Sequence, residues 1–184
     1  FFYQNAAGNR DNIKIEINYS MRQHVLQPQK RIINVAFLQN IPIMTLHPIE
    51  LFGSKIKALI ERYTCRDLYD VYNLLHSELI KDMDFALLRK IVVFYLTVGG
   101  SKVASTNYTM DGIKQIKFQQ IRATLLPMLK KGDSFDYERA KTEVIEFLER
   151  LLLLNDSEIA FVEAFVSKQY KPELLFTDKE IINN

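Results

Sequence analysis

Five of the charged residues between positions 55 and 70 have types and spacing that suggest phosphate chemistry. Lys55 and Arg62 are seven residues apart and therefore share one side of a helix. Arg66, Asp67 and Asp70 follow at the start of the next expected helix. Such cations can neutralise a triphosphate. An acid at Asp70 within reach of Lys55 could position that lysine, or serve as a base toward an acceptor hydroxyl.

The same residues also have structural interpretations. Lys55 could be a solvated surface lysine, which is where most lysines lie. Arg66 and Asp70 have the i,i+4 spacing of an ion pair, and Asp67 stands near a helix start, where a carboxylate suits the helix dipole. Arg62 fits a phosphate ligand or a structural partner. The pattern leaves these alternatives open, with Asp70 the stronger functional candidate of the two acids.

A further acid lies in an alternating segment near the start of the chain. Residues 13–19 read IKIEINY, which predicts a strand with one apolar face and one polar face. Glu16 falls on the polar face, where it could have a functional role or simply lie in solvent beside Lys14 and Asn18.

The elements that must position these residues change character near position 47. Strands are predicted over residues 30–38 and 41–46, with Pro42 at an edge or strand start, which gives a small antiparallel sheet. Beyond His47 the apolar period becomes helical, and Pro48 suits a first helical turn. Helices are expected over residues 48–63, 66–79, 84–98, 111–130, 137–154 and 157–168, with a short closing segment at 172–176. The sequence therefore predicts an α+β fold.

Composition excludes several classes of protein. The chain has 184 residues, of which 48% are hydrophobic and 25% charged, as in ordinary globular domains. A formal net charge of +2 does not by itself indicate nucleic-acid or membrane binding, and no apolar run reaches the length of a membrane span. The one cysteine, Cys65, excludes an intramolecular disulfide, suits a cytoplasmic protein and is expected to be a small buried residue. The three histidines have no metal-ligand spacing.

The predicted helix over residues 111–130 carries a run of basic side chains around Phe118. They could form a surface for RNA, although the solvated side of an amphipathic helix is the favoured interpretation. The basic residues are Lys114, Lys117, Arg122, Lys130 and Lys131.

A resemblance to a known family adds to this interpretation. Residues 46–75 read LHPIELFGSKIKALIERYTCRDLYDVYNLL and resemble the AbiEii/AbiGii toxin family, in which a helix with Lys, Ala-Leu and Arg runs into Arg-Asp-x-x-Asp. Here those positions are Lys55, 58–59, Arg62, and 66–70. The glutamate flanked by isoleucines at position 16 and the ending YKPELLF at 170–176 also resemble the family.

The resemblance implies a bacterial nucleotidyltransferase of the polymerase-β type, acting as the toxin of a toxin–antitoxin or phage-defence system. It implies an NTP substrate, Mg²⁺, an acceptor such as tRNA, and an antitoxin encoded nearby. Residues 1–46 would be a partial nucleotidyltransferase sheet, and residues 47–184 a helical bundle that completes the site. Glu16, Lys55 and Asp70 would be catalytic, with Glu16 also a metal ligand. The nucleotide would bind at Lys55, Arg62, Arg66 and Asp67.

The family's Gly-Gly/Ser turn and Asp-x-Asp motif are expected before the strand of Glu16, and they do not precede it here. Because the chain also begins at Phe1 without a methionine, we expect it to be a C-terminal portion that is inactive alone. Two other functions stay open: a non-catalytic helical module that binds an antitoxin, RNA or protein, and a purely structural domain. The enzyme hypothesis requires Lys55, Glu16 and Asp70 to converge on one cleft beside the sheet.

Overall fold

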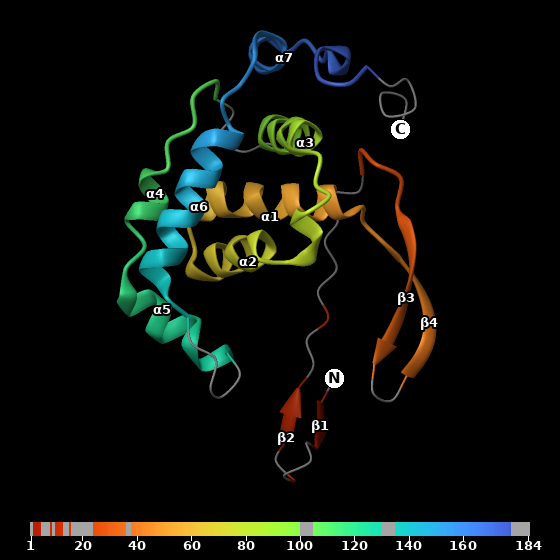
Figure 1. Ribbon diagram of the computed structural model, residues 1–184, viewed down its shortest axis with the longest axis vertical. Coiled ribbons are helices and arrows are strands. Elements are labelled where there is room, and N and C mark those ends of the chain that lie inside the picture. The colour runs from red at the N-terminus through yellow and green to blue at the C-terminus, as the bar shows by residue number, and fades with distance from the viewer. Residues whose placement is uncertain are drawn as a thin grey trace.

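The computed structural model describes residues 2–4, 8, 10–12, 15, 24–35, 38–99, 105–129 and 135–177. A body of helices occupies most of this range, and two short β-hairpins lie at its periphery (Figure 1). The α+β prediction is confirmed. No helix among these residues is long and apolar enough to cross a membrane.

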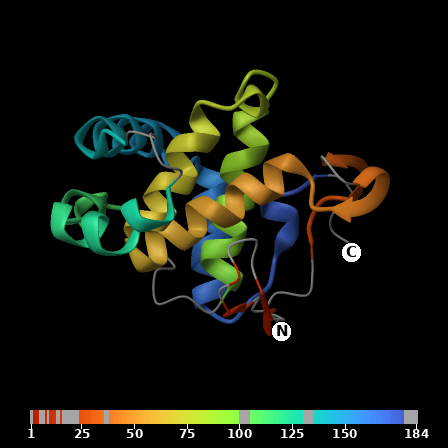
Figure 2. The same ribbon diagram turned by 90° about the horizontal axis from the view of Figure 1, so that it is seen from below.

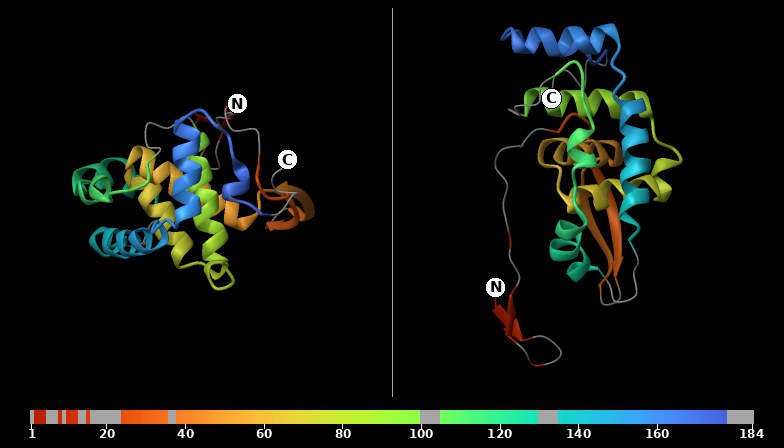
Figure 3. Two further views of the ribbon diagram at one scale, coloured as in Figure 1. Left: turned by 90° about the horizontal axis from the view of Figure 1, so that it is seen from above. Right: turned by 90° about the vertical axis from the view of Figure 1, so that its left-hand side faces the viewer.

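The strands form two separate antiparallel hairpins. β1 (Phe2–Gln4) pairs with β2 (Arg10–Asn12), and β3 (Gln29–Val35) pairs with β4 (Leu38–Thr45). The β1–β2 hairpin lies well away from the helices (Figure 3). The β3–β4 pair confirms the strands predicted at 30–38 and 41–46, within three residues at each end. Pro42 lies in an edge strand, as expected, because β4 has only β3 as its partner in the described sheets.

The strand predicted over residues 13–19 lies almost entirely outside the described residues, and Glu16 is among those not described. The one described position, Ile15, belongs to no strand and is 66% exposed. At Ile15, therefore, the prediction of a core-facing strand residue is wrong.

Two helices form the centre of the body. α1 (Pro48–Arg62) places Phe52, Ile56, Leu59 and Ile60 on one fully buried stripe, as its helical period predicts. α3 (Phe85–Val98) begins at the capping residue Asp84 and packs across α1. The two helices approach so closely at Gly53 that a β-carbon there would stand 2.7 Å from a methyl group of Ile91.

The remaining helices surround this pair (Figure 1). α2 (Cys65–Leu75) and α6 (Tyr137–Leu151) pack together, and α7 (Asp156–Val166) covers α3. α4 (Asp111–Lys114) and α5 (Phe118–Thr124) lie on the opposite side of the body from the β3–β4 hairpin (Figure 2). Three short 3-10 turns, η1 (Glu78–Ile80), η2 (Leu126–Met128) and η3 (Pro172–Leu174), complete the described elements.

Two helix predictions are wrong in extent. The helix predicted over 111–130 is broken into α4, α5 and η2, because the backbone is extended at Lys117 and its N–H is capped by the Gln120 side chain at 3.0 Å. The helix predicted to reach Leu79 ends at Leu75. Leu79 then falls in η1 and is 37% exposed.

A buried carboxylate that the sequence analysis did not single out ties the start of α1 to its surroundings. Glu50 is fully buried and accepts hydrogen bonds from the backbone N–H groups of Val25 at 2.7 Å and Leu26 at 3.1 Å. The hydroxyl of Tyr95, on α3, donates a third hydrogen bond to it. One side chain therefore joins the segment before β3, α1 and α3.

We expect Glu50→Ala to lower the free energy of unfolding by about 3 kcal/mol or more, because three buried donors would each lose an acceptor at about 1–3 kcal/mol. Urea denaturation would measure this loss. Glu61→Ala on the same helix is a comparison that removes one acceptor instead of three. Glu61 accepts a hydrogen bond from Lys57, in a pair whose side chains are 22% and 15% exposed, and we expect a smaller loss than for Glu50→Ala. Equal effects of the two substitutions would contradict the assigned role of Glu50.

Burial, with the hydrogen bond to Glu50, raises the pKa of Tyr95 well above its ordinary value. A raised folded-state pKa gives stability that is complete below the pKa of the unfolded chain, about 10, and is lost as the pH rises above it. We therefore expect the free energy of unfolding to fall more steeply between about pH 10 and 11.5 in the wild type than in Tyr95→Phe, by up to about 1.4 kcal/mol per pH unit. Parallel curves would exclude this contribution.

Candidate functional site

The lysine of the 55–70 block is held by an acid from the neighbouring helix. The Nζ of Lys55 on α1 lies 2.7 Å from an Oδ2 oxygen of Asp70 on α2. Both side chains are about two-fifths exposed, at 41% and 39%. Of the partners considered for Asp70, the structure thus shows Lys55 and not Arg66. An exposed pair of this kind stabilises a protein by only about 0–1 kcal/mol, so folding alone gives little reason for it.

The second ion pair is far more buried on its acidic side. Arg62 donates from Nε to one oxygen of Asp67 at 3.1 Å and from Nη2 to the other at 2.5 Å. The Asp67 side chain is 5% exposed, whereas that of Arg62 is 61% exposed. The Thr64 hydroxyl also donates to Asp67 at 2.6 Å. Asp67 is therefore a buried acceptor that fixes the orientation of an exposed guanidinium.

The turn between α1 and α2 places these two pairs next to each other. α1 ends at Arg62, Tyr63 adopts a left-handed conformation with φ 49°, and Thr64 caps α2 by accepting the N–H of Asp67 at 3.2 Å. The Gly112 backbone of α4 packs directly against the Tyr63 ring, and a β-carbon at this position would come within 2.4 Å of ring carbons. Burial, and next the charge of Asp111, raise the pKa of Tyr63.

α5 contributes the other wall of the site. It packs against α2, and the Nε of Arg66 donates to the backbone carbonyl of Thr124 at 3.3 Å. The Cys65 sulfur contacts the same residue of α5, at 2.9 Å from the Thr124 hydroxyl. Cys65 is only 4% exposed, so its prediction as a small buried side chain is confirmed.

The five charged residues that the sequence analysis singled out between positions 55 and 70 line one cleft of about 500 Å³. Its described lining residues come from α1, the turn after it, α2 and the end of α5, with no strand among them. The cleft therefore lies between helices, and the β3–β4 hairpin is on the other side of the body (Figure 2). The expectation of a cleft beside the sheet is thus wrong for the described strands. The lining residues are Lys55, Arg62, Thr64, Cys65, Arg66, Asp67, Asp70 and Thr124.

Each cation in the cleft keeps donors that its internal partner does not use. Lys55 has three N–H donors and contacts one carboxylate oxygen. Arg62 has five and directs two to Asp67, and Arg66 directs its Nε to a carbonyl. The remaining N–H groups are the donors that phosphate oxygens accept most strongly. The geometry thus suits binding of an oxyanion with several oxygens.

The described carboxylates of the cleft do not fit a Mg²⁺ site. Asp67 and Asp70 are each matched by a cation, and no group of three or more His, Cys, Asp or Glu residues with metal-binding geometry occurs in the described part of the chain. Mg²⁺ needs oxygen ligands in near-octahedral geometry, several of them charged or water. Glu16, the predicted metal ligand, lies outside the described residues.

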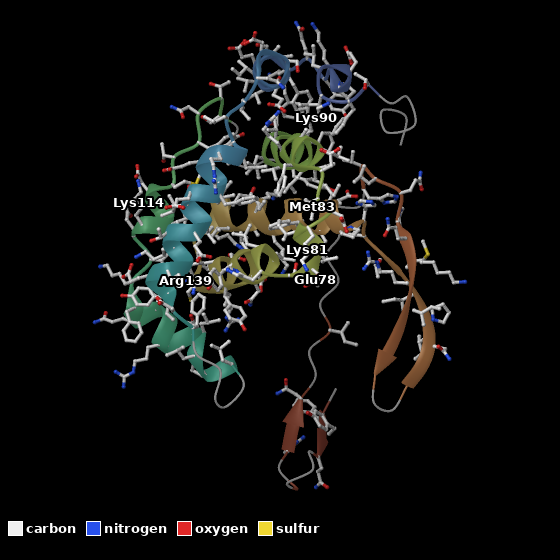
Figure 4. All side chains as sticks on the ribbon, viewed as in Figure 1. Glu78, Lys81, Met83, Lys90, Lys114 and Arg139 are labelled. Carbon is white, nitrogen blue, oxygen red and sulfur yellow. The ribbon has the colours of Figure 1, made fainter. Side chains whose placement is uncertain are left out.

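The basic residues of 111–131 are divided by the break between α4 and α5. Lys114, Lys117 and Arg122 are exposed, and Lys114 pairs with Asp111 at 3.3 Å. In Figure 4, Lys114 and Arg139 both lie on the outer side formed by α4 and α6. The exposure agrees with the solvated-face interpretation, and Lys130 and Lys131 lie outside the described residues.

Sequence reasoning missed the contribution of α5. Thr124 is 58 residues from Arg66, and no motif connects the two positions. It also missed the pair between Arg89 and the fully buried Glu158, 69 residues apart. Contacts at this separation become visible only in the folded chain.

The comparisons with known proteins agree with the resemblance in the 46–75 block. The family model described as nucleotidyl transferase AbiEii toxin, type IV TA system, matches residues 1–165 of the chain. Searches of curated proteins and of solved structures found no match.

The two acids of the cleft are expected to differ in their contribution to stability. Asp67→Ala removes a buried acceptor from Arg62 and Thr64 and should lower the free energy of unfolding by about 2 kcal/mol. Asp70→Ala removes a half-exposed pair and should cost less than about 1 kcal/mol. Urea titrations of both variants measure the difference, and a larger loss for Asp70→Ala would overturn the assignment of Asp67 as the structural acid.

Proposed function

The chain belongs to the AbiEii family of nucleotidyl transferase toxins of type IV toxin–antitoxin systems, and we propose that its helical cleft binds the triphosphate of an NTP during nucleotide transfer to an acceptor such as tRNA. The observation that carries this proposal is the convergence of Lys55, Arg62 and Arg66 on one cleft. In each, an internal acceptor holds one edge of the cation and leaves other donors available to a ligand.

These cations can assist nucleotide transfer because they are already held in position before the reaction. The acceptor hydroxyl attacks the α-phosphorus, the bond from that phosphorus to the bridging oxygen breaks, and pyrophosphate leaves with the bond's electron pair. Positive side chains already fixed near the leaving oxygens stabilise the developing charge without reorganising. Arg62 and Arg66 suit contact with two oxygens each, whereas Lys55 acts as a compact charge.

Asp70 is assigned a positioning role toward Lys55. At 2.7 Å from Nζ its carboxylate holds the lysine ammonium group in the cleft. A second role, as the base that receives the proton of the acceptor hydroxyl, needs an oxygen that is not engaged by Lys55. The ion pair uses Oδ2, and no hydrogen bond engages Oδ1 in the described part of the chain.

Arg62 and Asp67 have different roles: Arg62 contacts the ligand, and Asp67 supports Arg62. Asp67 lies beneath the cleft surface, so its direct contact is with Arg62 and Thr64. Arg62, at 61% exposure, presents the outer edge of its guanidinium to a ligand. Nucleotide binding is thus assigned to Lys55, Arg62 and Arg66, and Asp67 acts through Arg62.

The proposal includes Mg²⁺ for the reaction, with its ligands outside the described residues and Glu16 among the candidates. The described acids of the cleft are matched by cations. The wider proposal is a toxin that works in the bacterial cytoplasm, in phage defence, and is counteracted by an antitoxin encoded nearby.

We expect Lys55→Ala and Asp70→Ala in the intact protein to abolish nucleotide transfer and toxicity, while the thermal midpoint stays within a few degrees. Transfer can be followed with labelled NTPs and total bacterial RNA, and toxicity by growth after induction. Lys57→Ala is the matched control, because Lys57 pairs with Glu61 on the same helix and does not line the cleft.

Full transfer and toxicity in both cleft variants would overturn the site assignment. A non-catalytic binding module would instead be favoured by two results together. The wild-type protein would transfer no nucleotide, and the cleft variants would lose toxicity while NTP binding stays undiminished.

A further inference from the structure

A second cavity, separate from the cleft, lies where the start of α3 meets the end of α6. Its volume is about 380 Å³, and it shares no lining residue with the cleft. Ligand sites typically occupy about 300–1,000 Å³, so this one suits a small molecule at the lower end of that range. Its lining residues are Phe85, Ala86, Arg89, Phe147, Arg150 and Leu151.

Arg89 enters this cavity as a fixed guanidinium. Its Nε lies 2.8 and 2.9 Å from the two carboxylate oxygens of Glu158, a residue with no exposed surface. The Arg89 side chain itself keeps 24% of its surface exposed. Because the inner nitrogen is anchored, the terminal Nη groups are held in place at the cavity wall and can donate to a ligand.

Arg150 faces the same cavity from the other helix with a similar arrangement. Its Nε donates to the backbone carbonyl of Glu146 at 3.1 Å, and the residue is exposed. Neutralising Glu158 explains the presence of Arg89, but it explains nothing about Arg150. Two guanidinium groups anchored through Nε suit a carboxylate or phosphate, which accepts donors in pairs.

Aromatic rings form the apolar part of the cavity. Phe147 is stacked on the buried Phe52 at a centroid distance of 5.9 Å, which fixes its position. Phe85 lies edge-on to Phe147 at 6.0 Å and is 45% exposed. An aromatic ring at the mouth of a cavity offers a face for stacking to a second flat group.

We propose that this cavity is a binding site for a compact aromatic anion, in which a single ring carries a phosphate or carboxylate group. The ring would pack against Phe85 and Phe147 while Arg89 and Arg150 hold the anionic group. The site stands apart from the proposed nucleotide cleft and does not depend on it.

The probe is phenyl phosphate, titrated into the isotopically labelled intact protein and followed by NMR chemical shifts. Inorganic phosphate supplies the anion alone, and benzyl alcohol supplies the ring alone. We expect phenyl phosphate to shift the signals of Ala86 and Leu151 and to bind about tenfold more tightly than either half. Equal binding of inorganic phosphate, or shifts confined to the cleft around Lys55, would overturn the proposal.

Substitutions separate the two parts of the site. Arg150→Ala and Phe85→Ala should each weaken phenyl phosphate binding by about tenfold or more. Arg89→Lys tests the fork of the guanidinium while keeping a cation beside Glu158, so the fold is retained, and it should weaken binding as well. Arg139→Ala is the matched control on α6, since this exposed arginine is paired with Glu143 and lies outside the cavity (Figure 4).

Lys55→Ala should leave phenyl phosphate binding at this cavity unchanged. A loss of binding in Lys55→Ala but not in Arg150→Ala would place the probe in the cleft and refute the second site. The outcome does not depend on whether the protein transfers nucleotides.

Discussion

The cleft depends on one buried carboxylate. Asp67 accepts two hydrogen bonds from Arg62 and one from Thr64, and these contacts span the turn that joins α1 to α2. The turn sets the relation of the two helices, and that relation brings Lys55 within 2.7 Å of Asp70. Without a buried acceptor at position 67, the exposed Arg62 would have the conformational freedom of an ordinary surface arginine. The arrangement is thus a rigid support beneath a charged surface.

Charge balance explains how three cations can share a small volume. Lys55, Arg62 and Arg66 face two carboxylates, so the cleft carries a small formal excess of positive charge. Like charges in proximity repel, and interleaved acids reduce that repulsion without using all the N–H donors. A polyphosphate could then bind by adding hydrogen bonds to cations that are already oriented, which lowers the entropy lost on binding. Membership of a nucleotidyl transferase family agrees with such a site.

The sequence predicted local features well and distant ones poorly. Helical periodicity identified the buried stripe of α1, and residue spacing brought Lys55, Arg62 and Asp70 together, because neighbouring helices with a short turn have few ways to pack. The pattern could not show that Asp70 would pair with Lys55 rather than with Arg66, since both partners are sterically possible. The continuous helical period predicted one helix in place of α4 and α5. In the structure the helix breaks at Lys117, because the Gln120 side chain caps the Lys117 N–H. Thr124 and the Glu50 bonds depend on tertiary contacts that no local rule contains. The sequence pattern assigned Glu16 a polar strand face, and its metal role stays a prediction.

The central claim is that preorganised cations make the cleft a polyphosphate site, and calorimetric titration with inorganic tripolyphosphate tests it most directly. For the intact wild-type protein we expect saturable binding in a one-to-one ratio, weakened by about tenfold or more in Arg66→Ala and unaffected in Arg139→Ala. Affinity that is equal in all three proteins, at matched ionic strength, would show that tripolyphosphate binds elsewhere and would contradict the account.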